Sequence, residues 1–281
     1  MKVTELTDAL IDLALAEDIG DGDHTTLSCI PIQAIGQSKL LIKQHGILAG
    51  VDVALEVFQR VDPDLQVEVF LNDGAEIHRG DVAFIVSGSV RSILQAERLV
   101  LNIMQRMSGI ATVTHRYVRQ LEGTSAKVLD TRKTTPGMRM LEKQAVKIGG
   151  GTNHRIGLFD MILLKDNHVD FAGGIEKAIL SAQHYLKENN KKLKIEVEVR
   201  NFDELDEALR TGGIDRIMLD NFTPANTRRA VELVDRRVEL ESSGGITFDT
   251  IREYALAGVD YISVGALTHS VDSLDMSLKA L

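Results

Sequence analysis

The chain contains no tryptophan, and aromatic residues make up only 4% of its 281 positions. Such a composition argues against a surface on which exposed nucleic-acid bases stack. The net charge of −9 leads to the same conclusion, because an acidic protein repels nucleic acid and anionic membranes alike. We therefore expect neither nucleic acid nor a membrane as a partner.

Cysteine is almost absent too. The single cysteine, Cys29, cannot form an internal disulfide, which is typical of an intracellular protein. No apolar run approaches the ~18 residues that a membrane-spanning helix needs. Glu5, Asp8 and Asp12 stand where a secretory signal peptide would carry basic and then apolar residues. The expectation is a cytoplasmic protein.

The apolar content is that of a globular protein, at 44% hydrophobic and 26% charged residues. A chain of this length allows one large domain or two ordinary ones. The spacing of Val3, Leu6, Leu10 and Leu13 predicts an amphipathic helix at the start. Between residues 39 and 89, short apolar runs alternate with turn sequences, which predicts an α+β region.

Two groups of polar residues in this first part of the chain have an ordinary structural explanation. Residues 17–26 are acidic and contain two glycines, a pattern that indicates a turn. A strong helix is predicted over 91–107, and Arg98 lies on its polar side. From the spacing alone, Arg98 is expected to lie on the solvent-exposed face of this helix.

After Gly109 a further helix is expected, followed by six strand–helix repeats. Strand alternating with helix at this rhythm predicts a parallel sheet. Six units are fewer than the eight of a full barrel, so the pattern favours an irregular, incomplete α/β barrel. An open doubly wound sheet is the weaker alternative, because no G-x-G-x-x-G turn follows the first strand. The predicted strands are Lys127–Thr131, Met161–Lys165, Lys194–Val199, Arg216–Asn221, Val238–Ser242 and Tyr261–Ala266.

Polar residues follow each predicted strand at the end where barrel strands meet substrate. A single such residue is common, but six in succession are hard to explain by loop solvation alone. The first two repeats deliver a basic group, which suits carboxylates because guanidinium forks bind them bidentately. In an acidic protein this group indicates a small anionic ligand. It consists of Arg132, Lys133, His154, Arg155 and Lys165.

Glu198 and Asp220 end the next two strands and are the only acidic pair on successive strand ends. They are either buried ion-pair partners of the basic group or ligands of a Mg²⁺ that accompanies a phosphate substrate. Glycine-bearing turns at 243–245 and 264–266 follow the last two strands, a frequent phosphate position in barrels. A carboxylate subsite, a metal-bridged centre and a phosphate subsite together fit phosphoribosyl diphosphate with a carboxylic acid acceptor.

The chain resembles the quinolinate phosphoribosyltransferase family, whose activity is also called nicotinate-nucleotide pyrophosphorylase (carboxylating), a type II phosphoribosyltransferase. The similarity runs nearly end to end and includes residues 17–26 and AERLVLN at 96–102. The motifs that carry it are DTRKT at 130–134, NHR at 153–155, LLKDNH at 163–168, EVEV at 196–199, LDNF at 219–222, ESSGGI at 241–246 and VGALTHS at 264–270.

The resemblance implies an N-terminal α/β sandwich domain over 1–108 and an irregular barrel over 109–269. A last helix over 270–281 would return to the first domain. It implies transfer of phosphoribosyl from phosphoribosyl diphosphate to quinolinate with decarboxylation, giving nicotinate mononucleotide, CO₂ and diphosphate for NAD biosynthesis. Mg²⁺ would accompany the donor. A homodimer or larger homo-oligomer is also implied.

The resemblance further implies roles for individual residues. Quinolinate would contact Arg98 of a partner subunit, together with Arg132, His154, Arg155 and Lys165. The donor would contact Lys133, Glu198, Asp220, Ser243, Gly244, Gly245, Gly265 and His269. Glu198 and Asp220 would hold the Mg²⁺–diphosphate, directly or through water. Catalytic roles would fall to Lys133, Lys165, Glu198 and Asp220.

Three alternatives stay open. A paralogous family associated with molybdenum transport genes shares the fold, although the complete acceptor set here favours quinolinate. A Schiff-base aldolase would use Lys165 as a nucleophile at a barrel strand end. A non-catalytic protein that binds phosphorylated metabolites would need only the anion subsites.

Overall fold

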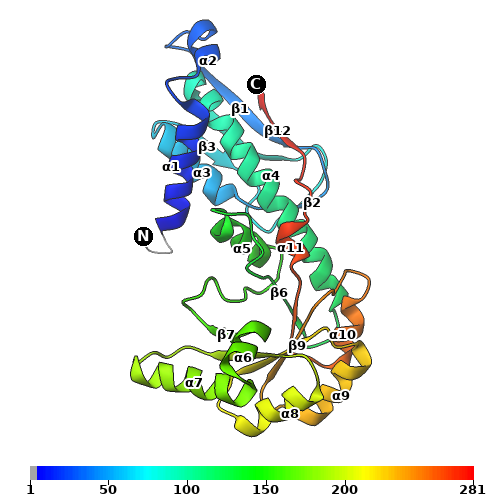
Figure 1. Cartoon of the computed structure of the whole chain (residues 1–281). Helices are drawn as coiled ribbons and strands as arrows, with labels where there is room; N and C mark the ends of the chain where they lie inside the picture. The colour runs from blue at the N-terminus through cyan, green and yellow to red at the C-terminus, as the bar shows by residue number, and fades with distance from the viewer. Residues whose placement is uncertain (1–4) are drawn as a thin grey trace. The chain divides into compact units, whose positions relative to one another are not determined.

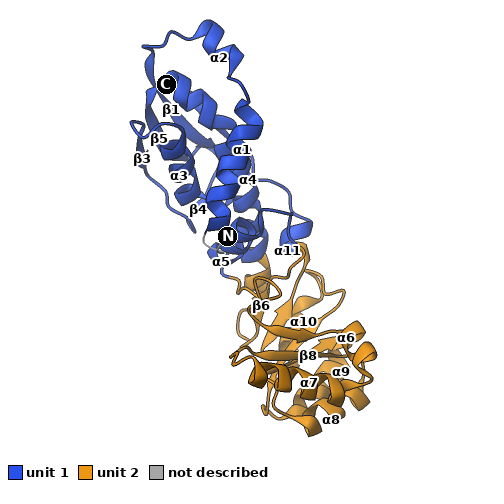
Figure 2. Ribbon diagram, turned by 60° about the vertical axis from the view of Figure 1, so that its left-hand side comes forward, with its two compact units in different colours: residues 1–115, 134–150, 267–281 blue, residues 116–133, 151–266 orange. Residues whose placement is uncertain are grey.

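The computed structural model describes residues 5–281, which form two compact units (Figures 1 and 2). Unit 1 comprises residues up to 115, 134–150 and 267–281, and unit 2 comprises 116–133 and 151–266. Val3, the first position of the predicted opening helix, lies outside the described residues. Within the described part of the chain, no helix is long and apolar enough to cross a membrane.

Unit 1 is built on a four-stranded antiparallel sheet in the order β12-β1-β5-β3. Phe58 of the helix over 51–61 meets Phe84 of β5 edge to face in the core, with ring centroids 5.8 Å apart. The α+β region predicted for residues 39–89 is confirmed. Its elements are α1 (Leu6–Ile19), α2 (His24–Cys29), β1 (Ile35–Ile42), β2 (Gly46–Ile47), α3 (Val51–Val61), β3 (Gln66–Val69), β4 (Glu76–Ile77) and β5 (Val82–Ser89).

Helix α4 (Val90–Gln120) is one continuous helix of 31 residues, so the prediction of two helices separated at Gly109 is wrong. A Cβ at Gly109 would collide with the backbone oxygen of Asp272 and lie 3.2 Å from its carbonyl carbon. The glycine is therefore needed for close packing inside the helix and does not end it.

The end of the chain forms strand β12 (Met276–Ala280), so the helix expected over 270–281 is also wrong. β12 pairs antiparallel with β1, with Leu278 opposite Leu40. The return to the first unit is made by a strand because an edge of the sheet offers backbone donors and acceptors. The two compact units do not divide at the single boundary expected after residue 108. α5 (Arg139–Ile148) packs against α1 within unit 1.

Unit 2 contains a six-stranded parallel sheet in the order β6-β11-β10-β9-β8-β7. Each of the six predicted strands is present within two or three residues, and the sheet is an incomplete barrel. Helices α7 to α10 pack side by side against it (Figure 1). The elements are β6 (Lys127–Leu129), β7 (Ile162–Leu164), α6 (Asp166–Ala172), α7 (Ile175–Glu188), β8 (Ile195–Val199), α8 (Phe202–Thr211), β9 (Arg216–Asp220), α9 (Pro224–Val234), β10 (Glu239–Ser243), α10 (Ile251–Ala257), β11 (Tyr261–Ser263) and α11 (Ala266–His269).

Candidate active site

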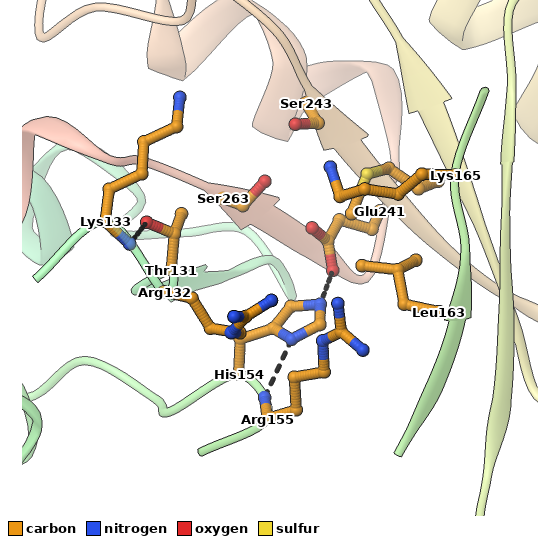
Figure 3. A pocket seen from close by; sticks show the side chains of 11 residues that line it. Thr131, Arg132, Lys133, His154, Arg155, Leu163, Lys165, Glu241, Ser243 and Ser263 are labelled. Carbon is orange, nitrogen blue, oxygen red and sulfur yellow. Dashed lines mark hydrogen bonds and ion pairs between the residues drawn. The ribbon is translucent and has the colours of Figure 1, made fainter. Parts of the chain in front are cut away.

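A cavity of about 330 Å³ opens at the carboxyl ends of the unit 2 strands. This is the strand end at which barrel enzymes place their sites. Five residues of the predicted acceptor and donor sets line it together, as Figure 3 shows. They are Arg132, Lys133, His154, Arg155 and Lys165, with Ser243 as a sixth from the phosphate turn. The remaining lining residues are Thr131, Leu163, Met218, Glu241 and Ser263.

Arg155 is the more buried of the two arginines in the cavity wall, at 9% exposure. One of its guanidinium nitrogens, Nη1, donates to the carbonyl of Met161 at 3.3 Å. Burial lowers the pKa of this guanidinium, and the nearby charge of Arg132 lowers it further. Among the described residues, no carboxylate lies within ion-pair distance of Arg155. A half-desolvated guanidinium of this kind is suited to an anionic ligand.

His154 lines the cavity and is also held by protein groups at both ring nitrogens. Its Nδ1 accepts the backbone N–H of Arg155 at 2.7 Å, and its Nε2 lies 3.0 Å from Glu196 Oε2. Its own backbone N–H donates to the buried carboxylate of Asp130 at 2.8 Å. Both ring nitrogens therefore face protein groups, and His154 also helps to hold Arg155, while its direct contact with quinolinate stays a prediction.

Lys165, at the end of β7, is half-exposed, and its Nζ lies 3.2 Å from Glu198 Oε2. Burial raises the pKa of Glu198, the lysine opposes this, and the negative charge of Asp220 adds to it. Two carboxylates and one ammonium group thus meet at the ends of three neighbouring strands, β7, β8 and β9. The sequence allowed Glu198 to be either an ion-pair partner of the basic group or a Mg²⁺ ligand, and the structure contains the ion pair with Lys165. Asp220 does not take part in this ion pair.

The turn after β10 is part of the predicted phosphate subsite. Gly244 has φ of 94° and Gly245 has φ of 60°, a region that side chains other than glycine rarely adopt. A Cβ on Gly244 would clash with Asn221 Oδ1 and lie 2.9 Å from the Asn221 backbone nitrogen. Asn221 in turn donates its backbone N–H to the carbonyl of Ser243 at 2.9 Å. The two turns after β9 and β10 are therefore packed backbone to backbone.

Three further predicted residues are not among those that line the cavity. Gly265 follows β11 in unit 2 and is partly exposed. Arg98 is exposed on α4 and His269 ends α11, and both belong to unit 1. His269 Nδ1 lies 2.7 Å from Ser270 Oγ.

The sequence-based prediction missed a charged layer next to the cavity, namely Glu196, Arg216 and Glu241, which are less than 9% exposed, and of which Glu241 lines the cavity. The sequence pattern that could have identified these residues is the alternation along a strand, in which every second side chain faces the same side of the sheet. Glu196 lies two residues before Glu198, and Glu241 two before Ser243, so each pair faces the same side of its strand.

Two family models match the chain. The model described as quinolinate phosphoribosyl transferase, N-terminal domain, covers residues 23–108, and the model for the C-terminal domain of the same enzyme covers residues 110–279. Together they span most of the chain.

Individual relatives agree with the family models. Quinolinate phosphoribosyltransferase (decarboxylating) 1b of Nicotiana tabacum is 46% identical, over 96% of this chain and 81% of the relative. Probable nicotinate-nucleotide pyrophosphorylase (carboxylating) of Bacillus subtilis is 42% identical, over 96% of this chain and 91% of the relative. The crystal structure of NadC from Streptococcus pyogenes has a TM-score of 0.92 at 39% identity, covering 100% of this chain and 99% of that one. The chain belongs to the quinolinate phosphoribosyltransferase family.

Proposed function

We propose that the chain transfers phosphoribosyl from phosphoribosyl diphosphate to quinolinate with loss of CO₂, forming nicotinate mononucleotide and diphosphate in NAD biosynthesis. The observation that supports this most directly is the cavity of unit 2. Arg132, Arg155 and Lys165 converge there on a space of about 330 Å³, a size within the range of small-molecule sites. A cytoplasmic location stays a prediction.

The reaction needs no nucleophile from the protein. The quinolinate nitrogen attacks the anomeric carbon, the bond to diphosphate breaks, and the transition state has oxocarbenium character as in other glycosyl transfers. The resulting pyridinium then accepts the electron pair released when the adjacent carboxylate leaves as CO₂. The ring carbon takes up a proton in the last step. Positioning of two anions against one another supplies most of the acceleration in this proposal.

The family resemblance implies the residue roles, and the cavity lining supports those of its basic residues. Arg132, His154, Arg155 and Lys165 would bind the carboxylates, and His154 would also hold Arg155 in place. Lys133 would lie between acceptor and donor. The turn residues Ser243, Gly244, Gly245 and Gly265, with His269, would bind the 5′-phosphate through backbone N–H groups and polar side chains.

The donor set suits Mg²⁺. Glu198 and Asp220 offer only oxygen ligands, which Mg²⁺ prefers, and their mutual repulsion contributes to the raised pKa of Glu198. Glu198 and Asp220 would hold the ion, directly or through water. When bound with the donor, Mg²⁺ would neutralise charge on the diphosphate leaving group.

The test is direct. The purified protein is mixed with quinolinate, phosphoribosyl diphosphate and Mg²⁺, and CO₂ and diphosphate are measured. Release of both in equal amounts supports the proposal. A folded sample that forms neither product contradicts it and leaves a binding protein. Borohydride trapping of a carbonyl substrate on Lys165 would instead support the aldolase alternative.

A homodimer that shares its sites is the second part of the proposal. Unit 1 exposes several large apolar side chains, including Leu13 at 65% and Ile35 at 76% exposure, which a subunit interface would be able to cover. Arg98, also exposed in this unit, would complete the acceptor site of the partner subunit.

Subunit mixing tests this sharing. Arg98→Ala and Lys165→Ala proteins are each expected to be nearly inactive. If sites are shared in a dimer, each mixed dimer regains one intact site, so random exchange of equal amounts restores about one quarter of all sites. Activity is measured before and after exchange, and mass spectrometry of differently tagged chains confirms that exchange occurred. No recovery after proven exchange would place Arg98 in its own chain's site.

A further inference from the structure

Two histidines and a glutamate gather on the surface of unit 1, and the proposed reaction does not use them. They are His45, Glu76 and His78, and none of the three lines the cavity of unit 2. Each residue offers one ligand atom, and these atoms lie within 4.8 Å of one another. Two imidazoles and one carboxylate are a ligand set that proteins use for Zn²⁺. All three residues are exposed, so an ion in solution can reach them.

The pairing of β2 with β4 explains why these side chains meet. In this antiparallel ribbon Gly46 lies opposite Ile77. One step further along the ribbon His45 lies opposite His78, and their ring centroids are 4.8 Å apart. Glu76 and His78 are two residues apart, so their side chains face the same side of the segment. The three ligands therefore share one face of the ribbon, whose strands are labelled in Figure 1 (β2) and Figure 2 (β4).

Contacts within unit 1 fix the backbone that carries the ligands. In β2, the N–H of Ile47 donates to Thr112 Oγ1 of α4 at 2.8 Å. In the turn after β4, the N–H of Gly80 donates to the carbonyl of Ile42 on β1, and the N–H of Ile42 donates to the carbonyl of Asp81, both at 2.9 Å. Only rotation of side chains is then needed to complete a metal site, so little backbone order has to be created when an ion binds.

The distances suit a transition-metal ion. Nε2 of His45 lies 3.6 Å from Oε1 of Glu76. Zn–N and Zn–O bonds of about 2.0–2.2 Å at a tetrahedral angle place two ligand atoms about 3.4 Å apart. The two side chains are 62% and 66% exposed, so they can adjust by this small amount, and His78 can turn its ring toward them.

Asp81 gives His78 the support that metal-binding histidines usually have. Asp81 Oδ2 accepts the backbone N–H of His78 at 2.8 Å and lies 3.9 Å from His78 Nδ1. A carboxylate beside one ring nitrogen orients the imidazole and leaves the other nitrogen for the metal. Nε2 of His78 is therefore the nitrogen suited to an ion.

We propose that His45, Glu76 and His78 form a binding site for a divalent transition-metal ion such as Zn²⁺. The ion links β2 to the segment that follows β4, and it stabilises the folded unit 1 because it binds the folded chain. Mg²⁺ is not the ion expected here, since it prefers oxygen ligands to imidazole. The site thus differs in chemistry from the all-oxygen pair Glu198 and Asp220 of unit 2.

Titration of Zn²⁺ into the full-length protein tests this site. The protein is first freed of metal with a chelator, and millimolar Mg²⁺ is present throughout to occupy sites made of oxygen ligands alone. Calorimetry is expected to show an equivalent of Zn²⁺ per chain that His45→Ala and His78→Ala each bind at least about tenfold more weakly, because the loss of an orienting partner alone costs about 10- to 100-fold. Zn²⁺ bound elsewhere on the protein is common to all variants and cancels in the comparison.

His184→Ala is the matched control. His184 Nε2 lies 3.1 Å from Glu188 Oε1 on α7, and the two side chains are 69% and 61% exposed, much like His45 and Glu76. Among the described residues, this pair belongs to no group of three possible metal ligands. Zn²⁺ binding by H184A is expected to equal that of the wild type. The substituted side chains are all exposed, so the variants are expected to fold, which circular dichroism checks.

Thermal unfolding gives a second measurement. Zn²⁺ at about one hundred times its Kd is expected to raise the melting temperature of the wild type and of H184A by about 5 °C, but that of His45→Ala by less than about 1 °C. Loss of binding in His45→Ala and His78→Ala, with binding kept in H184A, supports the site. If all four proteins bind Zn²⁺ equally, or if the wild type binds none, the three residues form only a surface ion pair and the proposal is wrong. Neither result depends on the transferase activity.

Discussion

Arg155→Ala is expected to lose about 1,000-fold in kcat/KM for quinolinate while the KM for phosphoribosyl diphosphate changes by less than about twofold. The reason is the environment of the guanidinium. Arg155 is 9% exposed, and its pKa is lowered by burial and by Arg132, so the protein has already desolvated a cation without giving it a carboxylate. Quinolinate would supply that carboxylate. Removing the arginine leaves a substrate carboxylate in a poorly hydrated cavity with one cation fewer.

Two variants give the comparison for Arg155→Ala. Arg155→Lys keeps the charge but loses the two-nitrogen fork, so an intermediate loss of about 10- to 100-fold is expected. Arg210→Ala removes an exposed arginine of the same unit, paired with Asp206 at 2.9 Å on α8, and leaves both constants unchanged. Steady-state kinetics with each substrate varied in turn measures these effects. Equal losses for quinolinate and for the donor would show that the division into subsites is wrong.

The barrel was predictable because its signal is local. Short apolar runs such as Ile195–Val199 and Arg216–Asp220 end in charge and are separated by helical segments, and the structure has strands at these places. Parallel strands place their ends at one rim, so the residues after them converge in space even though they are far apart in sequence. That is why the positions of Arg132 and Lys165 at the ends of predicted strands, with Arg155 in the segment between these strands, were enough to group them, and all three line the cavity.

The errors come from contacts that are not local. Gly109 in a helical pattern suggests an interruption, but it allows the backbone at Asp272 to approach α4. The helix over 270–281 was implied by the family resemblance, whereas Leu274, Met276 and Leu278 alternate with a period of two, as in a strand. Pairing with β1 decides in favour of the strand. In both cases the partner segment lies more than 100 residues away, where spacing carries no information.

The charged layer next to the cavity was missed for another reason. Glu196 and Glu241 lie in motifs whose predicted function was assigned to the neighbouring residues Glu198 and Ser243. An acidic residue within a strand is also not expected to be fully buried, as these two are. Only the approach of Arg216 and His154 from other segments makes their burial tolerable. The sequence contains the alternation that places them inward, but not the partners that explain it.

Gly244→Ala is expected to raise the KM for phosphoribosyl diphosphate by about 100-fold or more, with binding of quinolinate retained. Gly244 has φ of 94°, and an added Cβ would clash with Asn221, whose backbone nitrogen would lie only 2.9 Å away. The turns after β9 and β10 must then separate, which breaks the hydrogen bond from the Asn221 N–H to the Ser243 carbonyl. Backbone N–H groups proposed to bind the 5′-phosphate would lose their direction, and each such charge-assisted bond contributes about 1.5–3 kcal/mol.

Gly212→Ala separates this geometric effect from backbone strain alone. Gly212 has φ of 68° at the end of α8, and a Cβ there would meet no atom within 4 Å. The variant carries a similar left-handed strain of about 1 kcal/mol without a clash, so a lower melting temperature with an unchanged donor KM is expected. Thermal unfolding and donor kinetics of the two variants are measured in parallel. If the KM of Gly244→Ala for the donor equals that of the wild type, the phosphate does not bind at the turn after β10. The turn at Gly265 after β11 would then be the next position to test, because it is the other glycine-bearing strand end at the same rim.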